Sequence, residues 1–139
     1  MNDLQRAFAI ISLSSTAALL VLSTVVLIQW LPGAKMKPQK HTEWLILGVC
    51  TGFIGLHCDN IWWGIAWAMR LLDNPNWTWW FDNGVISNVI FRQGFKIVSS
   101  FCHLKAAVAF GGMTEEELAN VSKASISVFA LSFWMLVTF

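Results

Sequence analysis

The sequence predicts an all-α, polytopic integral membrane protein: a helical bundle of four transmembrane helices, with three as the alternative. Of its 139 residues, 56% are hydrophobic and 12% are charged, whereas soluble domains carry about 25% charged residues. The apolar residues also gather in long stretches, and crossing a ~30 Å hydrocarbon layer takes roughly 20 residues. Trp occurs nine times, as is typical of proteins anchored at membrane interfaces. We therefore expect one membrane domain over residues 1–139.

The first two expected spans flank a basic loop. Residues 7–31 contain no charged side chain, and this stretch is too long for a signal-peptide core, so we expect a retained span. Residues 44–69 form the second expected span. The loop between them contains Lys35, Lys37 and Lys40. Because basic loops stay on the cytoplasmic side, we expect the N-terminus outside.

The third and fourth expected spans cover residues 85–110 and 118–139. A loop between the second and third spans is rich in Trp, and its rings are expected to anchor at the outer headgroup layer. These interfacial anchors are Trp77, Trp79 and Trp80. With four crossings, Lys105 and Lys123 join the other lysines inside and both termini lie outside, which favours four crossings over three.

Two periodic patterns mark the second and third spans. Three glycines at steps of four and three form one helical face, and small residues in this pattern permit close helix packing. These glycines, which we call the glycine face, are Gly48, Gly52 and Gly55. The third span carries a polar stripe at helical spacing, made of Asn88, Arg92, Lys96, Ser99 and His103.

Charged side chains at membrane depth each need a partner or water. If the second and third spans form an antiparallel hairpin, Asp59 lies at about the depth of Arg92 and Lys96. We therefore expect an intramembrane ion pair. It could only hold the hairpin together, or the polar stripe could line a hydrated path in an oligomer. Alternatively, the third segment lies on the membrane and its basic side chains reach the headgroups.

Catalytic, cofactor and metal sites are not expected. Ligand-type side chains occur in both central spans, at His57, Cys58, Asp59, Cys102 and His103. In the hairpin their depths differ too much for shared ligation. The three cysteines lie in apolar segments, where a free thiol packs as a small hydrophobe. No nucleophile–base signature occurs, so we expect no enzyme.

These observations predict a protein that acts by assembling in the membrane, as a homo-oligomeric pore or channel or, alternatively, as a non-catalytic accessory subunit of a larger membrane complex. A redox or metal-binding membrane protein is the third class. The build, a short polytopic chain with minimal loops, is similar to that of phage holins and other lesion-forming proteins, although holins commonly end in a charged tail and this sequence ends in an apolar run. The expected partners are the lipid bilayer and either copies of the chain or partner membrane subunits, with no nucleic acid. The expected location is the bacterial cytoplasmic (inner) membrane.

Overall fold

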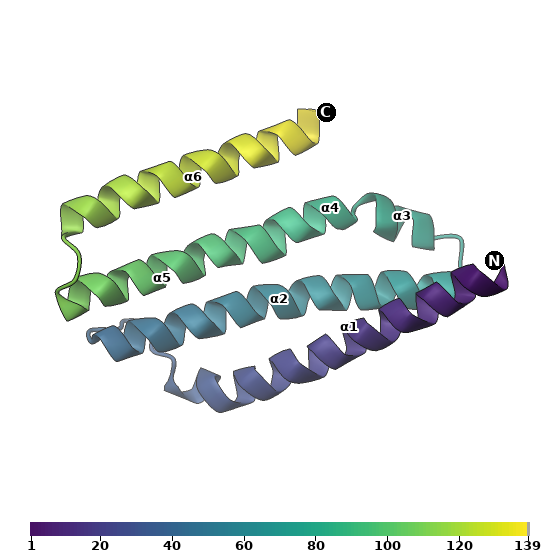
Figure 1. Cartoon of the computed structure of the whole chain (residues 1–139), viewed down its shortest axis with the longest axis horizontal. Helices are drawn as coiled ribbons and strands as arrows, with labels where there is room; N and C mark the ends of the chain where they lie inside the picture. The colour runs from purple at the N-terminus through teal and green to yellow at the C-terminus, as the bar shows by residue number, and fades with distance from the viewer. Residues whose placement is uncertain (139) are drawn as a thin grey trace.

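The computed structural model describes residues 1–138, which are helical throughout apart from short turns and contain no strand. The long helices are α1 (Asp3–Trp30), α2 (His41–Leu71), α5 (Phe95–Phe110) and α6 (Glu115–Thr138). The shorter elements are the 3₁₀ turn η1 (Leu31–Gly33), the helices α3 (Trp77–Asp82) and α4 (Gly84–Ser87), and the π-helical segment η2 (Asn88–Gly94). Because α4, η2 and α5 follow one another without a break, residues 84–110 form one continuous rod (Figure 1).

Three helices are long and apolar enough to cross a membrane: Asp3–Gly33, His41–Leu71 and Glu115–Thr138. They contain the first, second and fourth expected spans, apart from Phe139, which lies outside the described residues. The third expected span lies within the rod 84–110. The Trp-rich connection differs from the expected loop, because α3 makes a helical turn there.

The helix ends follow local capping rules. The Asn2 side chain accepts a hydrogen bond from the Gln5 amide at 2.8 Å, which caps α1. At α6, Thr114 Oγ1 accepts from the Glu117 amide and the Glu117 carboxylate accepts from the Thr114 amide. Thr114 and Glu117 therefore form a capping box at the start of α6. The turn before it uses Gly111 at a φ of 90°, in the left-handed region that glycine adopts without strain.

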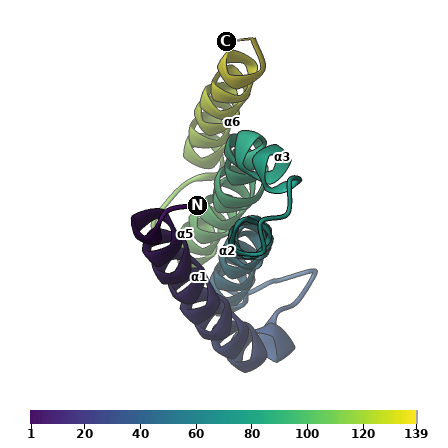
Figure 2. The ribbon, with the colours of Figure 1, turned by 90° about the vertical axis from the view of Figure 1, so that its right-hand side faces the viewer.

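Helix α2 is the central element, with α1 on one side and the rod 84–110 on the other (Figures 1 and 2). Both neighbours run antiparallel to it, and the Phe8 and Trp67 rings meet at 5.6 Å where α1 and α2 pack. Helix α6 lies beyond the rod, and of its described residues only Leu118 is buried. The molecule therefore consists of a packed three-helix unit with a fourth helix loosely attached.

The buried core is made of small side chains. Its apolar members are Ala9, Cys50, Ala66, Val89, Cys102, Ala106 and Leu118. Small residues let helix backbones approach closely, which is how helices associate in membranes. Asp59 is the largest side chain that is fully buried. A carboxylate therefore occupies the position that a large apolar residue fills in most cores.

Candidate functional site: a buried charge pair between two helices

Helix α2 and the rod 84–110 contact each other along their whole length. Residue numbers rise along α2 as they fall along the rod. The contacts that define this register are His41–Phe110, Gly48–Cys102, Gly55–Phe95 and Trp63–Gly84. This is the antiparallel hairpin on which the sequence-based depth comparison depended. It brings Asp59 and Arg92 together and leaves Lys96 outside.

The charge pair lies near the middle of this hairpin. Arg92 Nε is 2.6 Å from Asp59 Oδ2, and the side chain of Asp59 is 0% exposed. The Arg92 side chain is 39% exposed, so one side of the guanidinium faces outward. Ser87 Oγ donates to the other carboxylate oxygen at 3.3 Å. Separating such a pair leaves a buried charge uncompensated, which costs about 3–5 kcal/mol.

Hydrogen bonding within this cluster is incomplete. Although Arg92 Nε and Asp59 Oδ2 are close, the N–H is not aligned for a hydrogen bond, and neither atom has another hydrogen-bond partner. The same guanidinium reaches Asn60 Oδ1 through Nη2 at 3.5 Å, while the buried Asn60 Nδ2 has no partner among residues 1–138. The pair is therefore held mainly by charge attraction, and its polar atoms retain unused hydrogen-bonding capacity.

The π-helical segment η2 determines which residues face Asp59. Its hydrogen bonds run from i to i+5, so residues five apart follow one another on the same side. Ser87 and Arg92 are five apart, and both reach the Asp59 carboxylate. In a regular α-helix two such residues would point in different directions. Sequence reasoning at the α-helical period selected Asn88 and missed Ser87. Asn88 is partly buried and has no side-chain hydrogen bond within the described chain.

The glycine face of α2 is the surface on which the rod lies. A Cβ on Gly55 would lie 2.3 Å from the Phe91 carbonyl oxygen and 2.4 Å from Phe95 Cβ. At Gly48 a Cβ would meet the His103 ring at 2.9 Å. At Gly52 it would meet Ser99 Oγ at 3.2 Å. At Gly55, one turn before Asp59, the obstacle includes backbone, so only glycine permits the approach there.

Two further members of the polar stripe form hydrogen bonds, one across the hairpin and one within α5. Ser99 Oγ donates to the Gly48 carbonyl at 2.6 Å, across the helix interface. His103 Nδ1 lies 2.7 Å from the Ser99 carbonyl, a geometry in which Nδ1 carries the proton and donates it. Lys96, by contrast, is exposed and forms no ion pair in the part of the chain that the structure describes. The stripe is therefore divided between the interface and the outside.

The expected Trp anchors belong to a larger aromatic cap at one end of α2. The Trp62 indole N–H donates to the Trp80 carbonyl at 3.0 Å, and its ring also meets Trp79. Trp77 packs edge-on against Phe81, with ring centroids 5.5 Å apart. The cap comprises Trp62, Trp63, Trp67, Trp77, Trp79, Trp80 and Phe81. Sequence reasoning found the loop rings but not their contacts with α2.

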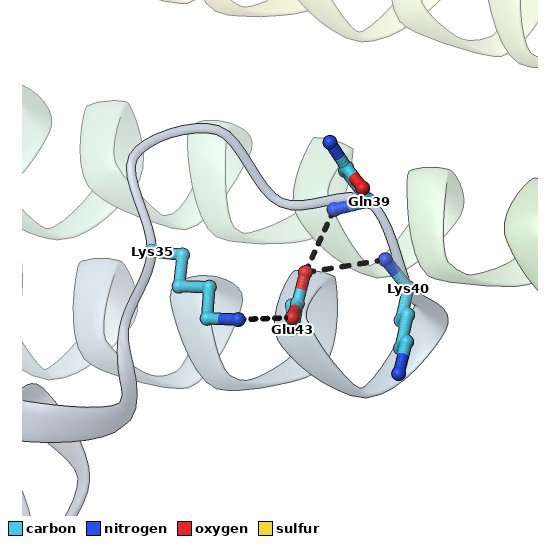
Figure 3. Close-up of polar contacts among 4 residues, drawn as sticks. All are labelled: Lys35, Gln39, Lys40 and Glu43. Atoms are coloured by element: carbon cyan, nitrogen blue, oxygen red, sulfur yellow. Dashed lines mark hydrogen bonds and ion pairs between the residues drawn. The ribbon is translucent and has the colours of Figure 1, made fainter.

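At the opposite end of the molecule, Glu43 organises the basic loop (Figure 3). Its carboxylate accepts from the Gln39 amide at 2.8 Å and the Lys40 amide at 3.3 Å, and Lys35 Nζ lies 2.5 Å away. These contacts, led by the Gln39 amide, lower the pKa of Glu43 from 4.5 to about 2. Glu43 precedes the uncharged run of α2, so this ionised cluster lies outside residues 44–69.

Another polar contact joins two of the long helices. Ser23, which is fully buried on α1, lies 2.7 Å from His57 Nδ1 and so joins α1 to α2. Cys50, Cys58 and Cys102 are free thiols. Among residues 1–138, no three His, Cys, Asp or Glu side chains come together in a way that could hold a metal ion.

Comparison of the chain with protein-family models, with curated proteins and with solved structures finds no match.

Proposed function

We propose that the protein is a non-enzymatic, four-crossing integral membrane protein that acts by assembling in the membrane, first of all with copies of itself as a holin-like pore. The observation that carries this proposal is the exposure of α6. Its apolar run has no buried residue beyond Leu118, and large side chains on it such as Val128 and Leu131 are more than half exposed. A helix with so little packing inside its own chain needs lipid or other helices around it.

The pairing of α2 with the rod 84–110 supports four crossings over three. Since the rod runs antiparallel beside α2 from Trp44 to Trp63, a membrane that α2 crosses is crossed by the rod as well. At 1.5 Å per residue the rod is about 40 Å long, enough for a ~30 Å hydrocarbon layer. The central charge of the rod, Arg92, is compensated by Asp59 of α2.

The grouping of the chain ends supports the proposed orientation. The basic loop after α1 and the turn between α5 and α6 lie at one end of the molecule, while the N-terminus, α3 and the end of α6 lie at the other (Figure 1). Lys105 and Glu115 pair at 3.1 Å at the first end. We place this end in the cytoplasm and the aromatic cap at the outer headgroups, in the cytoplasmic membrane of a bacterium.

The groove between the rod and α6 is the proposed assembly surface. A cavity of about 450 Å³ lies there and is lined in part by Gln93, Ser125 and Ser132. The nearby Ser122 Oγ is buried without a hydrogen-bond partner in the described chain. Polar groups at membrane depth are better satisfied by another helix than by lipid, so a second copy fits this groove better than acyl chains do.

The polar stripe does not provide the path in this proposal. Arg92 and Ser99 bond across the hairpin, so a path lined by them would require α2 and the rod to separate. We therefore assign the stripe to hairpin stability and the groove to assembly.

The test is expression of the full chain in bacteria while membrane potential is followed, with oligomer mass measured after extraction in mild detergent. Ser125→Trp fills the groove, and Ser127→Trp is the matched control because Ser127 is exposed on the same helix and bonds only to the Lys123 carbonyl. We expect wild type and Ser127→Trp to form oligomers and to depolarise the cells, and Ser125→Trp to do neither. Inserted wild-type protein that stays monomeric and leaves the potential intact would overturn the proposal and favour an accessory subunit.

A further inference from the structure

Arg70, in the last turn of α2, is held inside the aromatic cap. Its guanidinium carbon lies 4.8 Å from the Trp77 ring centroid, 5.5 Å from that of Phe81 and 5.7 Å from that of Trp67. Stacking of this kind attracts a cation to ring faces and reduces its freedom of movement. The cap therefore fixes a positive charge in one place at the end of the molecule.

The hydrogen-bonding capacity of this guanidinium is unused. Arginine has five N–H donors, which match the oxygens of a phosphate or carboxylate. Within residues 1–138 no carboxylate pairs with Arg70 and no acceptor takes a hydrogen bond from its side chain. An arginine positioned by three rings with its donors open is arranged to bind an anion.

A cavity of about 300 Å³ lies beside this guanidinium. It is lined by Met1, Gln5, Arg70, Asp73 and Trp77. Asp73 therefore contributes a carboxylate to the same cavity without forming an ion pair with Arg70. Asp73 lies just beyond the end of α2. Its backbone has a φ of 51°, an uncommon conformation for a non-glycine residue. The cavity wall thus carries the fixed guanidinium of Arg70 and the carboxylate of Asp73, with Met1 beside them.

We propose that this cavity binds the zwitterionic headgroup of a phospholipid, with the phosphodiester at Arg70 and a primary ammonium at Asp73. A carboxylate accepts hydrogen bonds from a primary ammonium, which a quaternary ammonium cannot donate, so phosphatidylethanolamine fits better than phosphatidylcholine. The inference rests on the proposed membrane insertion, in which the aromatic cap lies at headgroup level. One lipid bound here would join α2, α3 and the N-terminus of α1.

The test is native mass spectrometry of the full chain released from detergent, titrated separately with phosphatidylethanolamine, phosphatidylglycerol, phosphatidylcholine and inorganic phosphate. We expect one saturable phosphatidylethanolamine to bind at least tenfold more tightly than either other lipid. Arg70→Gln should abolish that preference, and Asp73→Asn should reduce phosphatidylethanolamine binding to the level of phosphatidylglycerol. Asp82→Asn is the matched control, because Asp82 is exposed at the end of α3, and it should bind as wild type does.

Three outcomes would overturn the inference. Equal binding of all three lipids would show a nonspecific lipid shell. Competition by millimolar inorganic phosphate would show a simple anion site. An unchanged lipid preference in Arg70→Gln would show that Arg70 does not bind the headgroup. Arg70→Lys, which retains the charge but loses the planar fork, serves as the second variant if Arg70→Gln does not fold. The groove variant Ser125→Trp should bind the lipid normally, which separates failure of assembly from failure of this site. Carbonate extraction of the same membranes tests insertion independently.

Discussion

Replacing Gly55 with alanine tests the close approach of α2 and the rod 84–110. The new Cβ would lie 2.3 Å from the Phe91 carbonyl oxygen and 2.4 Å from Phe95 Cβ. Neither obstacle is the end of a flexible side chain, so the helices themselves must move apart. That movement would also lengthen the contact between Asp59 and Arg92, which lies one turn further along the interface.

The net free energy can be worked out from two opposing effects. Alanine in place of glycine stabilises a helix interior by about 0.5–1 kcal/mol. Forcing an extra carbon into a packed interface costs about 1–3 kcal/mol. Because the carbon at position 55 meets backbone on one side, we expect the upper part of that range and a net destabilisation of about 1–2 kcal/mol. Weakening of the charge pair would add to this loss.

The assay is unfolding of the purified protein by SDS in mixed micelles, followed by Trp fluorescence. Gly64→Ala is the matched control, since it lies in the same helix and its Cβ would meet Thr16 Cγ2 at an ordinary 3.6 Å. We expect Gly55→Ala to unfold at a lower SDS fraction than wild type, and Gly64→Ala at the same fraction or higher. Equal midpoints for the two variants would refute the steric reasoning.

Three further changes probe the polar contacts. Arg92→Ala should destabilise the protein by about 3–5 kcal/mol in the same assay, because it leaves the fully buried Asp59 unpaired, whereas removing the loop charge in Lys37→Ala should have little effect; equal midpoints would contradict the ion pair. Ser99→Ala should cost only about 0.6 kcal/mol, typical of a hydrogen bond between membrane helices, and a loss above about 2 kcal/mol would mean that the hydroxyl does more. The pKa of Glu43 is lowered, so its loop contacts should persist below pH 4.5 and be lost as the pH falls through about 2; a ¹³C NMR titration of this carboxyl with a midpoint at 4.5 would contradict them.

Helix positions were predictable because charges and caps delimit them. The lysines of the first loop, the Thr114 capping box and Gly111 all act within a few residues, so a local pattern finds them. The pairing of Asp59 with Arg92 could also be approached from sequence, since equal depth in a hairpin follows from counting residues. Asp59 pairs with Arg92 and not with Lys96 because of how the rod is rotated about its axis, and counting residues does not predict that rotation.

The unpredicted parts of the site depend on irregular helix geometry and on contacts between distant segments. Ser87 faces Asp59 because of the π-helical segment, and the α-helical period points to Asn88 instead. Arg70 reads in the sequence as the charged end of a span, yet α3 folds back so that Trp77 and Phe81 cover it. The sequence signal that could have pointed to this contact is the high density of aromatic residues on both sides of the connection between α2 and α3.

The burial of Asp59 also has a consequence for biosynthesis. Asn60, the residue that follows Asp59, and its partner Arg92 are 32 residues apart in the chain. At a synthesis rate of roughly 5–20 residues per second, Arg92 is therefore made about 2–6 seconds after this part of α2. In the proposed topology α2 holds an uncompensated carboxylate during that interval, which costs about 2.5–3.5 kcal/mol at the centre of a membrane helix. In the proposed topology, insertion of α2 therefore stays provisional until the rod 84–110 has been made, and we expect the two helices to enter the bilayer as a pair.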